Sequence, residues 1–154
     1  MSTKVEAKSI NTSSSQTVPS LSLPYTFNSS IKFMDVVVHY HAMITTESIF
    51  VWIGDGKANL TQLSSAIQWK EPTDNSRNAV STTLISDGEL DDAATSLSER
   101  IVAKLGIPAF VSYSTRILDT TTRMLMEKAL VQALAEHVEE VKFLEKSAKD
   151  AQIE

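Results

Sequence analysis

Two neighbouring apolar runs, residues 35–44 and 48–53, constrain the fold of this chain more than any other feature. Both are rich in β-branched and aromatic residues, which favour strands. The short segment 45–47 separates them, which is typical of a hairpin. In each strand both faces carry large apolar side chains, whereas a strand with one wet face alternates apolar and polar residues. One face can pack on a core, so the other needs a helix, a second sheet or a partner subunit.

The rest of the chain predicts further strands and two helices. Strand patterns recur at 25–33, 59–69, 79–85 and 109–114. A spacing of 3.6 residues over 90–105 predicts a helix, which Gly106 and Pro108 terminate. A second helical pattern, long and C-terminal, covers 119–147. The order of elements indicates an α+β fold: an antiparallel, sandwich-like β meander with two flanking α-helices.

The chain length of 154 residues suits a single domain. Residues 1–24 are dominated by Ser and Thr, and such a segment cannot bury enough apolar surface to offset its ordering entropy. We therefore predict a disordered tail over 1–24, one domain over 25–147, and a frayed, charged tail over 148–154.

The amino-acid composition argues against several classes of function. The net charge of −5 argues against binding nucleic acid through phosphate neutralisation. There is no cysteine, so disulfides, thiolate metal sites and cysteine catalysis are excluded. The sequence has no apolar run long enough to span a membrane and no apparent leader. We expect a protein of the cytoplasm, with the nucleus as a second compartment.

Two local motifs invite a chemical interpretation. His39 and His41 share one face of a strand and could share a metal, with Asp35 as a carboxylate from the same strand. Two ligands are not a site and no thiolate is available, so a packed or hydrogen-bonded histidine pair is favoured. Residues 54–57, Gly-Asp-Gly-Lys, resemble the end of a phosphate-binding loop. That loop needs an earlier glycine and a Ser or Thr after the lysine, and Val51 and Ala58 stand there instead. We expect no enzyme activity and no cofactor.

Four segments resemble one known family. They are 37–43 (Val-Val-His-Tyr-His-Ala-Met), 46–54 (Thr-Glu-Ser-Ile-Phe-Val-Trp-Ile-Gly), 80–88 (Val-Ser-Thr-Thr-Leu-Ile-Ser-Asp-Gly) and 110–114 (Phe-Val-Ser-Tyr-Ser). In this order and spacing they are similar to the proteasome assembly chaperone 4 family, over about residues 27–145. The resemblance implies a non-catalytic chaperone that pairs with a proteasome assembly chaperone 3-like subunit. The pair would help the α-subunits of the 20S core particle form their ring.

The surplus apolar surface gives candidate interface residues on the hairpin and on the first half of the terminal helix: Val37, His39, His41, Met124, Leu125 and Val131. Two alternatives stay open. One is an α+β domain that binds a small ligand or a metal through His39, His41 and Asp35. The other is a generic scaffold adaptor with the same fold and different partners.

Overall fold

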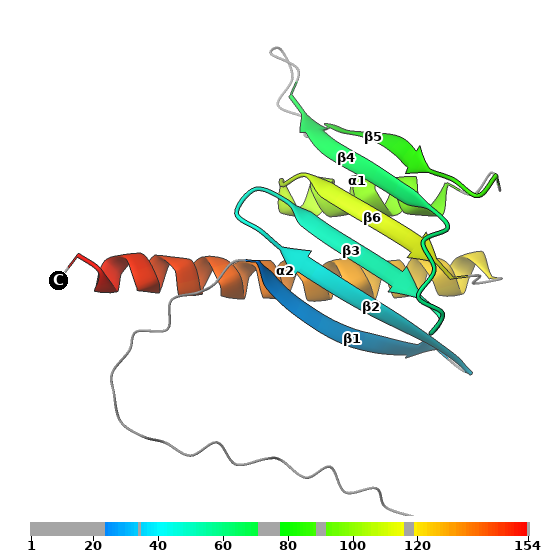
Figure 1. Cartoon of the computed structure of the whole chain (residues 1–154), viewed down its shortest axis with the longest axis horizontal. Helices are drawn as coiled ribbons and strands as arrows, with labels where there is room; N and C mark the ends of the chain where they lie inside the picture. The colour runs from blue at the N-terminus through cyan, green and yellow to red at the C-terminus, as the bar shows by residue number, and fades with distance from the viewer. Residues whose placement is uncertain (1–23, 34, 71–77, 89–91, 116–118, 154) are drawn as a thin grey trace, which may run out of the picture.

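A computed structural model describes residues 24–33, 35–70, 78–88, 92–115 and 119–153. The predicted disordered tail lies outside these residues, except for Pro24. Figure 1 shows the elements, which follow one another as β1 (Tyr25–Phe33), β2 (Val36–Ile44), β3 (Ile49–Gly54), β4 (Leu63–Trp69), β5 (Asn78–Ile85), α1 (Ala93–Leu105), β6 (Ala109–Ser114) and α2 (Thr120–Ala151).

The strands form one six-stranded sheet in the order β1-β2-β3-β6-β4-β5. The α+β class and the two helices are confirmed, and 59–69 contributes a strand, as expected. The sheet differs from the expected antiparallel, sandwich-like meander in two ways: it is a single layer, and β3 pairs with β6 in parallel. Helix α1 accounts for the direction of β6, because it carries the chain from β5 to the other side of β4. Strands β5 and β6 both run antiparallel to β4, and two strands of the same direction need a crossover, usually a helix.

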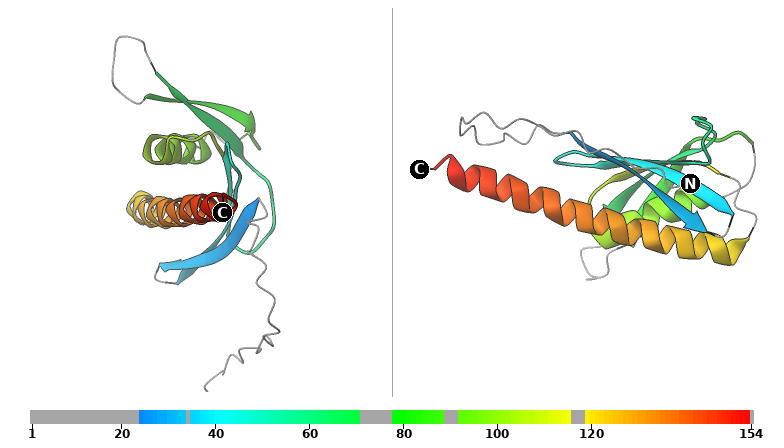
Figure 2. Two further views of the ribbon diagram at one scale, coloured as in Figure 1. Left: turned by 90° about the vertical axis from the view of Figure 1, so that its left-hand side faces the viewer. Right: turned by 90° about the horizontal axis from the view of Figure 1, so that it is seen from below.

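Both helices pack on the same face of the sheet (Figure 2). The alternate residues Val38, Tyr40, Ala42 and Ile44 of β2 point to that face and are buried. They join Leu97 and Ile101 of α1 and Leu130, Leu134 and Val138 of α2 in one core cluster. Full burial of each such large apolar side chain is worth about 1.5–3 kcal/mol, so this face holds the fold together.

The ends of the helices have clear local causes. Gly106 adopts a left-handed conformation (φ 70°) after α1 and its N–H donates to the Val102 carbonyl, which is how glycine commonly ends a helix. Asp119 precedes α2, and its carboxylate accepts hydrogen bonds from the Thr122 N–H and hydroxyl, both at 2.7 Å. These two bonds hold the pKa of Asp119 below its ordinary value. The helix then continues to Ala151, beyond the expected end at 147.

Candidate partner interface

The sheet face away from the helices is the largest unusual feature of the surface. Within the described part of the chain, neither helix crosses this face (Figure 2). We call it the open face. It carries the odd-numbered residues of β2 and the residues that pair with them across the sheet, because cross-strand partners point to the same side.

Large apolar side chains occupy the open face from β2 to β5. On β2 and β3 they are Val37, Met43, Phe50 and Trp52. On β6, β4 and β5 they are Phe110, Leu63, Ile67, Trp69 and Val80. Ile67, Trp69 and Val80 are each more than half exposed. Exposed large apolar side chains that gather on one face of a globular protein favour an interaction site there.

The Trp52 side chain packs at one corner of the open face, between Gly54 and the loop after β3. Its indole N–H donates to the Asn59 carbonyl at 3.0 Å, and the same oxygen accepts from the Ser114 hydroxyl at 2.6 Å. A Cβ on Gly54 would lie 2.2 Å from the Trp52 ring, so the ring lies over Gly54. The glycine is therefore needed for close approach, and the loop after β3 is fixed to the sheet.

The histidine pair lies on the open face. His39 is exposed, whereas His41 is half-buried and its Nδ1 hydrogen-bonds to the side chain of Asn28, its partner on β1. Among the described residues, no group of three or more His, Cys, Asp or Glu could hold a metal ion. Residues 54–57 end a strand and form a turn, and the next element is β4 rather than a helix. This context does not match a phosphate-binding loop.

The six candidate interface residues do not form one site. Val37, His39 and His41 lie on the open face, and the other three lie on α2, in the helical layer across the sheet. Met124 and Leu125 are exposed, and Val131 is half-buried against the core.

Neither of the described helices combines the length and the apolar character that a membrane-spanning helix needs.

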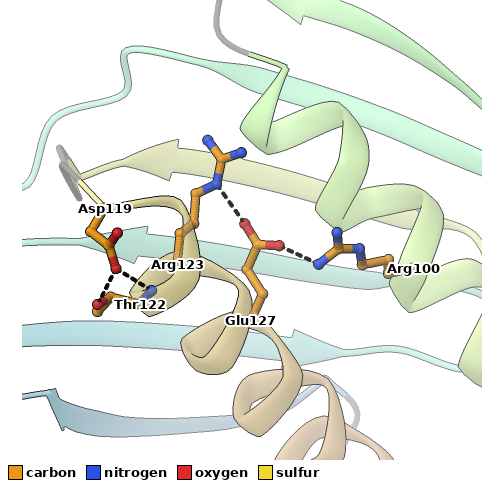
Figure 3. A network of polar contacts seen from close by, with 5 residues as sticks. All are labelled: Arg100, Asp119, Thr122, Arg123 and Glu127. Carbon is orange, nitrogen blue, oxygen red and sulfur yellow. Dashed lines mark hydrogen bonds and ion pairs between the residues drawn. The ribbon is translucent and has the colours of Figure 1, made fainter.

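Sequence analysis missed a buried ion network beside α2 (Figure 3). Glu127 is only 2% exposed; its Oε2 lies 2.6 Å from Nη1 of Arg100 on α1, and its Oε1 lies 3.7 Å from Nε of Arg123. The pair Arg123 and Glu127, four residues apart on a helix, was the available signal. The contact with Arg100 could not be read from the sequence, because it depends on how the helices pack.

The region from β2 to β6 matches the sequence pattern of a known protein family. The sequence model of the family described as proteasome assembly chaperone 4 matches residues 37–115, just over half of the chain. This chain belongs to the proteasome assembly chaperone 4 family. The matched region runs from β2 to the end of β6, so it holds most of the open face.

Two relatives with the family's name align with a larger part of this chain than the family model does. The human protein named Proteasome assembly chaperone 4 is 29% identical over 107 residues, which covers 70% of this chain and 82% of the human one. The mouse protein of the same name is 29% identical over 108 residues, with the same coverage. Both are named as assembly chaperones rather than as enzymes.

A solved structure shares the fold. It is titled "Crystal Structure of a Novel Chaperone Complex for Yeast 20S Proteasome Assembly", with a TM-score of 0.51 and 16% sequence identity. The likeness covers 80% of this chain and 98% of that chain.

Proposed function

We propose that this protein is a non-catalytic chaperone of 20S proteasome assembly that works as one half of a heterodimer. Family membership supports the chaperone role. The proposed pairing rests on the open face, because it is an apolar sheet surface that no described element of the chain covers. We infer that the partner is a proteasome assembly chaperone 3-like subunit and that the pair acts on the α-subunits of the nascent ring.

The shape of the open face suggests how a partner would bind. A second protein with its own uncovered sheet could pack against it at about 10 Å, so that the two sheets form a sandwich with helices outside. Interfaces of permanent partners are more apolar than those of transient ones. Phe110 lies on the inner strand β6, Ile67 and Trp69 lie toward the β5 edge, and polar β1 side chains line the opposite edge. An apolar surface of this kind fits a permanent partner.

Co-expression with the sister chaperone tests this arrangement. Ile67→Glu and Phe110→Glu put a charge on the open face, and we expect each to weaken pairing at least about tenfold, as for the loss of a buried apolar anchor. Leu125→Glu, across the sheet on α2, is the matched control and should pair normally. If Leu125→Glu abolishes pairing while Ile67→Glu and Phe110→Glu retain it, the partner binds the helical layer instead.

Affinity purification of the full chain from cells tests the chaperone role separately. Mass spectrometry should recover a second small chaperone together with proteasome α-subunits and without mature β-subunits. If proteasome subunits are absent and unrelated proteins are recovered, the chain is a scaffold adaptor. Metal analysis of the same material addresses the remaining alternative: a stoichiometric metal would point to the site at His39 and His41.

A further inference from the structure

The outermost stripe of α2 carries two exposed large apolar residues with no role in the core. Leu125 is 54% exposed and Phe143 is 70% exposed. They are eighteen residues apart, which is five helical turns and about 27 Å, so they point in the same direction. The positions between them follow the alternating spacing of four and three residues found at the contact positions of paired helices, but only the two ends carry large apolar side chains. The members of the stripe are Leu125, Ala129, Gln132, Glu136, Glu139 and Phe143.

This stripe points directly away from the sheet. The buried residues of α2 include Met126, Leu130, Leu134, Val138 and Val141, which lie on the opposite side of the helix. The C-terminal turns also extend past the edge of the sheet (Figures 1 and 2). The stripe is therefore accessible along its whole length, on the side of the molecule away from the open face.

The end of the stripe near Leu125 is basic. A groove of about 650 Å³ between α1 and α2 adjoins it, and its apolar wall includes Met124, Leu125 and Val131. The cations at this groove are Arg100, Lys104 and Lys128. Glu127 is buried and is paired by Arg100 and Arg123 (Figure 3), so it does not cancel the charge of the lysines. Lys104 and Lys128 make no ion pair with any described residue.

The end of the stripe near Phe143 has the opposite charge. Glu136, Glu139 and Glu140 precede Phe143 on the exposed surface of α2. Glu139 also lies 3.4 Å from Nζ of Lys142, but both side chains are more than half exposed, and such a contact is worth little. One helix thus carries a basic apolar end and an acidic apolar end on one face.

We propose that two copies of this chain pair through these stripes, with their α2 helices antiparallel about a two-fold axis. In this register Leu125 meets Phe143 of the second copy and Lys128 meets Glu139 of the second copy. A two-fold axis makes every contact twice. A parallel pair would instead place Lys128, Glu136 and Glu139 each against its own copy, whereas the antiparallel pair leaves only Glu136 near its own copy, beside the two-fold axis. Like charges that face each other across an interface are unfavourable, so the antiparallel pair is preferred.

The contact is a weak, concentration-dependent one. Only the two ends of the stripe carry large apolar side chains, so the contact belongs with the weak interfaces that bury less than roughly 1,200 Å². It lies across the sheet from the open face, so it can form whether or not a partner occupies that face. The inference does not depend on the proposed function.

Cysteine crosslinking tests the register, because the natural chain has no cysteine. Leu125→Cys and Phe143→Cys each introduce a single thiol into the full chain. We expect a mixture of the two variants to form disulfide-linked dimers at least about tenfold faster than either alone, because identical positions would be about 27 Å apart. Equal rates would overturn the proposal. Faster linkage of Leu125→Cys to itself would indicate a parallel pair and would also overturn it.

Exchange of charges tests the chemistry of the contact. Lys128→Glu and Glu139→Lys should each lower the association constant in sedimentation equilibrium, by roughly 2- to 30-fold since each exposed pair is counted twice. The double variant should regain association, and Lys149→Glu, off the stripe, should match the natural chain. A double variant that associates no better than the singles would contradict the pairing.

Association through the open face needs its own control. Ile67→Cys would crosslink to itself if two copies met through their sheets. Ile67→Glu should leave the Leu125–Phe143 crosslink unchanged. Loss of that crosslink in Ile67→Glu would show that the sheet, and not α2, holds the copies together, and would overturn the proposal.

Discussion

At the scale of single residues, the most consequential side chain is Glu127. A carboxylate that is 2% exposed is tolerated in this fold because Arg100 and Arg123 lie on either side of it (Figure 3). A charge taken out of water without a partner costs several kcal/mol, whereas a paired one approximately breaks even. The network therefore joins α1 to α2 in one arrangement rather than adding greatly to stability.

A double-mutant cycle measures this coupling. Arg100→Leu should lower the free energy of unfolding by about 1–3 kcal/mol, since Glu127 then keeps only the longer contact to Arg123. The double variant Arg100→Leu with Glu127→Leu should recover part of that loss, because the buried charge is gone. Urea denaturation gives the free energy of unfolding of the natural chain, the two single variants and the double variant. If the effects of Arg100→Leu and Glu127→Leu simply add, the two residues are not coupled.

The Asp119 cap should make the stability of the folded chain depend on pH in acid. Its pKa is lowered in the folded chain, chiefly by the side-chain hydrogen bond from Thr122 and then by the backbone one. The cap thus stabilises α2 at pH values above the ordinary 3.8 and its contribution is lost as the pH falls from there through the lowered pKa. Asp119→Asn should cap α2 as well at pH 7 but without this acid dependence. Thermal melts from pH 7 to 2.5 compare the two chains, and parallel curves would contradict the prediction.

At the scale of elements, the existence of each strand and helix could be predicted from its residue pattern, and so could the β2–β3 hairpin, whereas the pairing of β6 could not. Residues 109–114 show the strand signature in the sequence, but nothing in it says that β6 lies between β3 and β4. That position depends on the crossover α1 and on which strand edges are left unpaired. The open face was similarly predictable only as surplus apolar surface on the hairpin, because the sequence could not say which elements would leave it uncovered.

Helix α2 shows the difference between core and surface positions. Leu134→Ala should lower the free energy of unfolding by about 2–5 kcal/mol, because Leu134 is fully buried against the sheet. Phe143→Ala, on the same helix but 70% exposed, should change it by less than about 0.5 kcal/mol. Denaturant titration of the two variants at low protein concentration provides the comparison. Similar losses for both would show that Phe143 packs within the monomer.

At the scale of the whole molecule, the helices and the open face form two different sides of the protein. The helical side supplies the core, and no described element covers the other face of the sheet. Both tryptophans, Trp52 and Trp69, lie on the open face. Neither lies in the core around α1 and α2.

Tryptophan emission should therefore report on pairing. Trp69 is 57% exposed, so burial of the open face should shift the emission maximum to shorter wavelength when the sister chaperone is added. A tryptophan-free version of the partner isolates the signal. The variant Phe110→Glu should abolish the shift along with pairing. Unchanged emission in a complex that co-purifies would show that the partner binds elsewhere.

The position of β6 has a consequence for how the chain is made. The β1–β3 meander and the β4–β5 hairpin meet only through β6, which is the last strand within the described residues. On the ribosome β6 would follow β3 by roughly 3–12 s at synthesis rates of about 5–20 residues per second. During that interval the edge of β3 has no neighbour, and unpaired apolar edges are prone to aggregation. A protein that helps others assemble is thus itself most vulnerable in the seconds before its central strand arrives.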